Sequence, residues 1–306
     1  MSTLLLIDGN AVMHRAFHAI PPFKTKKGIP TNVLYGFFSM LHKAVVDFSP
    51  SHVVVCFDTP KPTFRNKLFK KYQAQRPKVD DDFIVQIPSV KEALDLAGVI
   101  HLEKDGYEAD DLLGTIAKHY NKNGVKVLIL SGDKDILQLV KGNVYVVSPQ
   151  GGISKMTIYD RAEVEKKLMV TPEQIPDYKA LAGDPSDNYP GAKGIGPKTA
   201  ANLIRQFESV ENIYKNLDKV KNPKVRQILC ENKDSVLLGK KLAEIITNVK
   251  IKFTIDKTKY NGFNDNLKDY LLGFEMKGLV SRLFAQKKQV KKTAEKKQEI
   301  PQPSLF

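Results

Sequence analysis

The chain has 306 residues, of which 42% are hydrophobic, so it can form one large packed domain or two smaller ones. Its 48 Lys and Arg exceed its 34 Asp and Glu, and the formal net charge of +14 favours a polyanionic partner, either nucleic acid or an anionic membrane surface. No stretch has the ~20 apolar residues that a membrane-spanning helix requires, and the N-terminus does not have the pattern of a secretory signal. The two cysteines, Cys56 and Cys230, suit a reducing cytoplasm and are too few for a cysteine-based zinc cluster.

Short apolar runs separated by helical segments dominate the first half of the chain. The runs are almost wholly apolar, as strands buried on both faces of a parallel sheet are, and they lie at 4–7, 53–57, 127–130 and 144–147. Apolar residues recur at helical spacing in the segments 31–48, 85–97 and 109–123. This alternation predicts an α/β fold with a mostly parallel central sheet over residues 1–169.

The rest of the chain has a different character. From about residue 170 the pattern changes to helices separated by Gly, Pro and Asn, which predicts a helical region over 170–284 that closes with a helix over 265–284. Within this region, segment 249–256 alternates as an edge strand does. Residues 285–306 are rich in lysine and poor in apolar side chains, so we expect a flexible basic tail.

Acidic residues gather at the ends of the predicted strands. Asp8 follows the first strand, Asp58 follows the second, and Asp133 and Asp135 follow the third. Because the C-terminal ends of parallel strands share one edge of a sheet, these side chains should meet in one crevice, where open α/β sheets place their sites. A further group opens the helix predicted at 109–123, where acids are also common as helix caps: Glu108, Asp110 and Asp111.

A single Asp after a strand is more often a turn residue than a ligand, but several groups at one edge require a counter-charge. Two unit charges ~4 Å apart repel by about 4 kcal/mol at an effective dielectric of ~20. Hard divalent cations such as Mg²⁺ or Mn²⁺ prefer carboxylate and water oxygens and would balance such a group. Two such ions can stabilise the attacking and leaving oxygens of a phosphodiester displacement.

Five segments resemble the successive motifs of the 5′-nuclease family, which includes the N-terminal 5′–3′ exonuclease domain of bacterial DNA polymerase I, phage 5′-exonucleases and flap endonucleases. They are LLLIDGN at 4–10, CFD at 56–58, GYEADD at 106–111, SGDKD at 131–135 and LAGDPSDN at 181–188. The resemblance runs from about residue 3 to about residue 284. It implies a PIN-like or resolvase-like nuclease domain, here as a stand-alone protein without a polymerase domain.

The resemblance also implies two bound Mg²⁺ (or Mn²⁺) ions and divides the acids between them. The first ion would be held mainly by Asp8, Asp58, Glu108, Asp110 and Asp111. The second ion would be held mainly by Asp133, Asp135, Asp184 and Asp187.

A glycine-rich turn, Gly194–Thr199, lies between two helical segments within about 176–207. Its glycines let backbone N–H groups approach a phosphate closely. An ATP-binding P-loop is excluded because Pro197 stands where that motif needs Lys, but the spacing alone also fits a plain helix–turn–helix connection. The 5′-nuclease family has a helix–hairpin–helix with this pattern, which grips the duplex backbone without reading sequence, often around a monovalent cation such as K⁺. The resemblance implies DNA contacts from Lys193, Gly194, Gly196, Lys198 and Thr199.

The segment at about 60–84 is dense in Lys, Arg and Pro and has aromatic residues between its charges. Such interleaving suits a single strand of nucleic acid, although a solvated basic helix is the commoner outcome. In the resembling family this position is a helical arch over the active site. The resemblance implies DNA contacts from Arg15, Lys70, Lys71, Tyr72 and Arg76. Gln73 departs from the family pattern, which has at this position a Lys that helps to hold the scissile phosphate.

Two smaller features remain. His14 and His18 lie one helical turn apart, which favours packing over a metal pair. The last five residues, 302–306, resemble the short peptide by which bacterial replication proteins dock on the sliding clamp, with Gln302, Leu305 and Phe306 as the contacting residues. The alternative for these five residues is an unstructured end that happens to contain Leu-Phe.

The sequence therefore predicts an enzyme, a 5′–3′ exonuclease and flap endonuclease that hydrolyses DNA by a two-metal mechanism in replication or repair. The expected partners are DNA with a 5′ flap, nick or free 5′ end, RNA–DNA primer hybrids and the sliding clamp, but no membrane. We expect a monomer in the bacterial cytoplasm, associated with the nucleoid. The alternatives are a catalytically silent module that binds branched DNA or the clamp, and an endoribonuclease of a related acidic α/β type.

Overall fold

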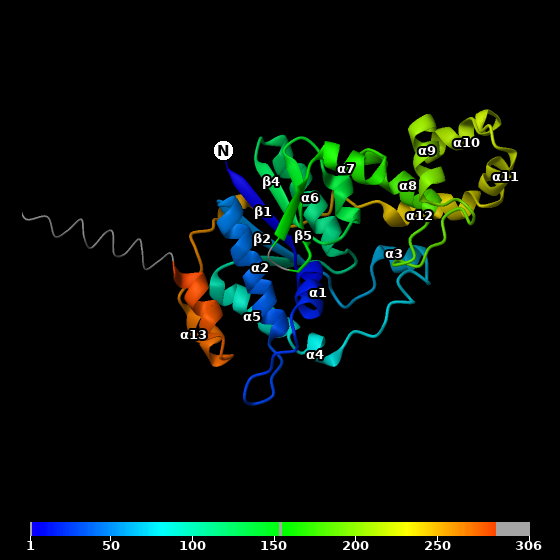
Figure 1. The fold of residues 1–306 in the computed structure, drawn as a ribbon. Coiled ribbons are helices and arrows are strands. Elements are labelled where there is room, and N and C mark those ends of the chain that lie inside the picture. The colour runs from blue at the N-terminus through cyan, green and yellow to red at the C-terminus, as the bar shows by residue number, and fades with distance from the viewer. Residues whose placement is uncertain (1, 153–154, 286–306) are drawn as a thin grey trace, which may run out of the picture.

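The computed structural model describes residues 2–152 and 155–285, and its centre is a six-stranded sheet in the order β3-β2-β1-β4-β5-β6 (Figure 1). The strands are β1 (Thr3–Asp8), β2 (His52–Phe57), β3 (Ile100–Glu103), β4 (Lys126–Leu130), β5 (Val144–Gln150) and β6 (Lys155–Tyr159). Strands β1 to β5 pair in parallel, and β6 pairs antiparallel with β5. The predicted α/β fold with a mostly parallel sheet is thus confirmed.

The four strands predicted from apolar runs are all present, and two strands at the edges of the sheet were missed. Both missed strands, β3 and β6, are half exposed, so their sequences lack a continuous apolar run. The central strands are buried on both faces. In β1, Leu4 and Leu6 belong to one hydrophobic core, whereas Leu5 and Ile7 belong to the other.

Each core is closed by its own set of helices. Helices α1 (Gly9–Ala19), α2 (Asn32–Phe48), α5 (Ile87–Ala97) and α13 (Asn266–Gly273) contribute buried side chains to one core. Helix α6 (Ala109–Lys122) covers the opposite face and shares its core with the C-terminal helices. The sheet therefore lies between two helical layers, and its strand ends remain available for a site.

The C-terminal half is helical, as predicted, and Figure 1 shows α9, α10 and α11 set apart from the sheet. Its helices are α7 (Arg161–Leu168), α8 (Ile175–Ala182), α9 (Pro197–Phe207), α10 (Val210–Lys215), α11 (Pro223–Glu231) and α12 (Lys233–Ala243). Short 3₁₀ turns lie at Asp135–Leu139, Pro172–Gln174, Leu217–Lys219 and Ile255–Thr258. In the basic segment, α3 (Phe64–Leu68) and α4 (Asp81–Ile84) are joined by a run of turns and extended chain.

Two predictions for the C-terminal region were wrong. Segment 249–256 is not a strand, because its alternate residues pack on one core while its backbone joins no sheet ladder. The helix predicted over 265–284 is interrupted: α13 ends at Gly273, Glu275 adopts a left-handed φ of 61°, and a second helical stretch starts at Lys277. A residue in that conformation cannot continue a right-handed helix, so the chain turns there.

None of the helices within 2–152 and 155–285 has the length and apolar character needed to cross a membrane. The predicted basic tail, with the resemblance to a clamp-binding peptide at Gln302, Leu305 and Phe306, lies outside the described residues.

Candidate active site

A cavity of about 380 Å³ opens at the C-terminal edge of the sheet. Seven of the nine predicted acids line it: Asp8, Asp58, Glu108, Asp110, Asp133, Asp135 and Asp187. Asp184 lies beside the cavity and groups with two of these acids, whereas Asp111 does not line it. The structure therefore brings together side chains that are up to 179 residues apart in the sequence.

Strand ends and helix starts fix the first acids in place. Asp8 ends β1 and caps α1, so its Oδ1 accepts from the Ala11 N–H at 2.9 Å and its Oδ2 accepts from the Ser131 hydroxyl at 2.7 Å. Asp58 follows β2, and its Oδ1 accepts from the Ala109 N–H at 2.7 Å, at the start of α6. Because β2, β1 and β4 are neighbours in the sheet, the acids at their ends lie side by side.

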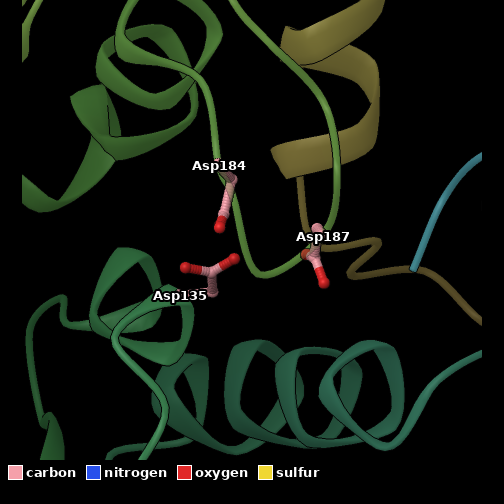
Figure 2. A group of neighbouring side chains, drawn as sticks. All are labelled: Asp135, Asp184 and Asp187. Atoms are coloured by element: carbon pink, nitrogen blue, oxygen red, sulfur yellow. The ribbon is translucent and has the colours of Figure 1, made fainter. Parts of the chain in front are cut away.

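The three-aspartate cluster (Asp135, Asp184 and Asp187) forms the second part of the site (Figure 2). One carboxylate oxygen from each residue lies within 4.8 Å of the others. Asp135 begins the 3₁₀ turn after β4, whereas Asp184 and Asp187 lie in the loop that follows α8. The Lys179 ammonium from α8 contacts the carboxylates of Asp135 and Asp184. No sequence pattern indicated that a lysine would balance this cluster.

Burial and mutual repulsion make it unfavourable for these acids to be ionised at the same time. Burial, reinforced by the charges of Asp58 and Asp133, raises the pKa of Asp8 to about 7. Burial likewise raises the pKa of Glu108 and of Asp135 to about 7, and the pKa of Asp110 well above its usual range. An all-oxygen set of this kind suits hard divalent cations, whose charge would restore the ionised form of the carboxyl groups. The donor chemistry of this chain therefore fits a metal centre.

These raised pKa values predict how the metal-free protein responds to pH. Because the folded pKa of Asp8 lies above its unfolded value, the protonated carboxyl stabilises the fold below about pH 4, and this contribution is lost as pH rises through 7. In EDTA, Asp8→Asn should therefore be more stable than the unsubstituted protein at pH 8, by about 2–4 kcal/mol. The advantage should disappear by about pH 4. Urea unfolding of both proteins across this range tests the prediction, which fails if the difference is independent of pH.

Asp111 has a different role from the other acids of its group. Its side chain is completely buried and forms a two-pronged ion pair with the Arg65 guanidinium, at 2.9 and 3.0 Å. Its oxygens also accept from the backbone N–H groups of Ile246 at 2.8 Å and Glu108 at 3.1 Å. With both oxygens engaged outside the cavity, Asp111 is not placed as a metal ligand. We propose that it anchors Arg65 instead of binding a metal ion.

Arg65 ties the basic segment to the rest of the site. This side chain is 2% exposed, and it donates to the carbonyls of Leu242 at 2.9 Å and Glu244 at 2.7 Å, where α12 ends. It also forms an ion pair with Glu108 at 3.2 Å. The sequence marked Arg65 only as one of many basic residues, because its acidic partner lies 46 residues away.

The turn after α3 reaches the three-aspartate cluster. The hydroxyl of Tyr72, the side-chain amide of Gln73 and the guanidinium of Arg76 all donate to Asp187, at 3.1, 3.1 and 2.9 Å. Tyr72 is 4% exposed, so its ring packs inside the protein and offers no open face for a base. Lys70, Lys71 and Arg76 are exposed, and Arg76 also lines the cavity.

The remaining predicted contact residues lie in two other places. Arg15 donates to the carbonyls of Pro149 at 2.8 Å and Gly152 at 3.2 Å, so its guanidinium is largely occupied by the end of β5. The hairpin between α8 and α9 exposes Lys193, Gly194, Gly196 and Lys198, with Thr199 half buried. Ile195 anchors this hairpin in the core, and Gly194 has a φ of 104° that favours glycine.

The histidine pair packs rather than forming a metal group. The His14 ring stacks on Phe83 at 4.4 Å between centroids, and His18 lies 6.4 Å from His14. Neither histidine belongs to the three-aspartate cluster.

Comparison with known proteins identifies the family to which this chain belongs. Residues 3–169 match the family model of the 5′-3′ exonuclease N-terminal resolvase-like domain, and residues 170–266 match that of the 5′-3′ exonuclease C-terminal SAM fold. The chain therefore belongs to the 5′-3′ exonuclease family. Within it, the 5′-3′ exonuclease of Aquifex aeolicus is 42% identical over 94% of this chain and 99% of that protein. DNA polymerase I of Bacillus subtilis is 42% identical over 85% of this chain, but this match spans 30% of the polymerase.

Solved structures agree on the fold. The T5 D15 protein, co-crystallised with metal ions, superimposes with a TM-score of 0.67 at 20% identity, covering 93% of this chain and 97% of that one. The catalytic core of Rad2 in complex with DNA substrate gives a TM-score of 0.58 at 17% identity, covering 93% and 92% of the two chains. At these identities the likeness shows a shared architecture.

Proposed function

We propose that this protein is a structure-specific 5′ nuclease that hydrolyses DNA phosphodiesters with two divalent cations, Mg²⁺ or Mn²⁺. The observation that carries the proposal is the convergence of seven acids in one cavity. Two of them, Asp135 and Asp187, form with Asp184 a cluster whose oxygens lie within 4.8 Å of one another. Membership of the 5′-3′ exonuclease family supports the same reaction.

The acids divide by position into two candidate metal sites. Asp8, Asp58, Glu108 and Asp110 would hold the first ion, and the three-aspartate cluster would hold the second. The resemblance implies that Asp133 serves the second ion, but we assign it to the first because its charge acts on Asp8 and Asp110. When bound, such a pair of ions would supply Lewis-acid stabilisation to the attacking and the leaving oxygen of the phosphodiester displacement. The protein's part is to hold the carboxylates, to fix Asp8 and Asp58 by backbone hydrogen bonds, and to keep Lys179 close enough to balance Asp135 and Asp184.

The positions of the exposed basic side chains support DNA binding without sequence readout. The exposed lysines of the α8–α9 hairpin and the basic residues after α3 suit contacts with phosphates, which position a duplex but do not specify a sequence. We further propose a substrate with a 5′ flap, a nick or a free 5′ end. RNA–DNA primer hybrids, K⁺ at the hairpin, the sliding clamp as a partner, and a location at the bacterial nucleoid remain predictions.

The test is an end-labelled 5′-flap duplex incubated with the full chain in Mg²⁺ or Mn²⁺ and, in parallel, in EDTA. We expect short 5′ products with metal and none in EDTA, and duplex binding that weakens steeply as salt increases. Binding without cleavage in every metal would refute the proposal and support a silent DNA-binding module. A preference for free single-stranded RNA would support the endoribonuclease alternative.

A further inference from the structure

One polar atom beside the three-aspartate cluster has no partner. Tyr189 lies in the loop between α8 and α9, its side chain is 3% exposed, and its hydroxyl makes no hydrogen bond within the part of the chain that the structure describes. Buried hydroxyls are almost always satisfied, since losing hydrogen bonds to water is unfavourable unless another partner replaces them. An unsatisfied buried hydroxyl requires an explanation, and a bound ligand that supplies the missing hydrogen-bond partner is one.

The backbone holds Tyr189 next to the cluster. Its N–H donates to the Asp184 carbonyl at 3.1 Å, and its own carbonyl accepts from the Asp184 N–H at 2.8 Å. Its side chain shares a small hydrophobic cluster with Tyr72, Leu242 and Ala243, and the Tyr72 hydroxyl donates to Asp187. A small pocket of about 190 Å³, bordered by Asp184 and Tyr189, leaves room for water beside it.

The Tyr189 side chain ends in a phenol hydroxyl, and the ordinary pKa of such a group, about 10, keeps it protonated at neutral pH. A protonated phenol is a hydrogen-bond donor. Tyr189 therefore presents a fixed donor to a group of acceptors.

The carboxylates of the three-aspartate cluster already have protein partners. Lys179 contacts Asp135 and Asp184, and Ser186 donates to Asp184 through its backbone N–H at 2.8 Å and its hydroxyl at 2.6 Å. Asp187 accepts from three groups of the turn after α3. These contacts give each of the three carboxylates a charged or hydrogen-bonding partner, whereas the Tyr189 hydroxyl has none among the described residues. A hydrated divalent cation would bring additional water oxygens to the site.

We propose that the Tyr189 hydroxyl is an outer-sphere donor to the divalent-cation site formed by the three-aspartate cluster, an inference that rests on the proposed two-metal function. Tyr189 is thus a positioning residue: its hydroxyl donates to a carboxylate oxygen or a water of the occupied site and favours the metal-bound state. Partners of this kind orient ligands, and their loss typically weakens metal affinity by about 10–100-fold.

The test compares Tyr189→Phe with Tyr214→Phe, using Mn²⁺ alone as the probe of the full chain. The Tyr214 hydroxyl donates to the Leu229 carbonyl at 3.1 Å, so it is a satisfied phenol away from the acids. Calorimetric titration with Mn²⁺ should show that Tyr189→Phe raises the dissociation constant of one of the two sites about tenfold or more. In EDTA the melting temperature of Tyr189→Phe should equal or exceed that of the unsubstituted protein. Adding Mn²⁺ should raise the melting temperature of the variant less than it raises that of the unsubstituted protein. Tyr214→Phe should bind Mn²⁺ normally and lose the same stability with and without metal.

Two results would overturn this inference while leaving the proposed two-metal function intact. One is unchanged Mn²⁺ affinity in Tyr189→Phe. The other is an equal loss of stability in EDTA and in Mn²⁺, which would mean that the hydroxyl is satisfied by a structural water in the neighbouring pocket. If the unsubstituted protein itself binds no Mn²⁺, the proposed two-metal function fails first, so the two failures can be told apart.

Discussion

Replacing Asp110 by Asn should abolish most cleavage while leaving the fold intact. Asp110 lines the cavity, and its pKa is raised by burial and by the charges of Asp8 and Asp133, so it is packed among the other acids. Losing one carboxylate from a divalent-cation site removes transition-state stabilisation of several kcal/mol. A loss of about 4 kcal/mol corresponds to about a 10³-fold lower rate.

The same substitution should not lower the thermal stability of the protein in the absence of metal. Asn is close to Asp in size and removes a charge that its neighbours repel, so the melting temperature in EDTA should stay equal or rise. Single-turnover cleavage of a 5′-flap duplex and thermal unfolding in EDTA measure the two effects. The matched control is Asp218→Asn, at an exposed aspartate in the C-terminal helical region, which should change neither quantity. Unimpaired cleavage by Asp110→Asn would contradict its assignment to the metal site.

Replacing Arg65 by Met should cost about 3–5 kcal/mol of folding free energy, because it leaves the buried Asp111 carboxylate without its counter-charge. Arg65 is 2% exposed and Asp111 is completely buried, so water cannot replace the lost partner. The carbonyls of Leu242 and Glu244 would lose a donor as well. Because Arg65 joins α3 to the end of α12, the variant should also bind flap DNA more weakly.

A double variant tests whether the unpaired charge of Asp111 causes the expected loss of stability. Arg65→Met with Asp111→Asn should be more stable than Arg65→Met alone, since the Asn side-chain oxygen can still accept from the Ile246 N–H without carrying a charge. Urea unfolding gives the free energies. Arg161→Met is the control: that arginine is 53% exposed in its ion pairs with Glu165 and Glu173, so its loss should cost under about 1 kcal/mol. Similar losses for Arg65→Met and Arg161→Met would contradict the anchoring role.

The sequence by itself determined the central sheet and most of the acid set. Strands β1, β2 and β4 are buried on both faces, so their sequences are continuous apolar runs, and the aspartates that follow them mark where the strands end. Because parallel strands end at one edge, the meeting of Asp8, Asp58 and Asp133 could be predicted without coordinates. Edge strands β3 and β6 could not be found this way, since half of each faces solvent.

Only the tertiary structure decided which acids face the cavity and what balances them. Asp110 and Asp111 are adjacent on α6, yet one lines the cavity while the other is paired with an arginine 46 residues away and with a backbone N–H 135 residues away. Lys179 reaches the cluster from α8, and the loop that follows α8 holds Tyr189, whose hydroxyl has no partner among the described residues. Local patterns report burial and turns, whereas the partner of a buried charge is set by segments that meet only in the folded chain.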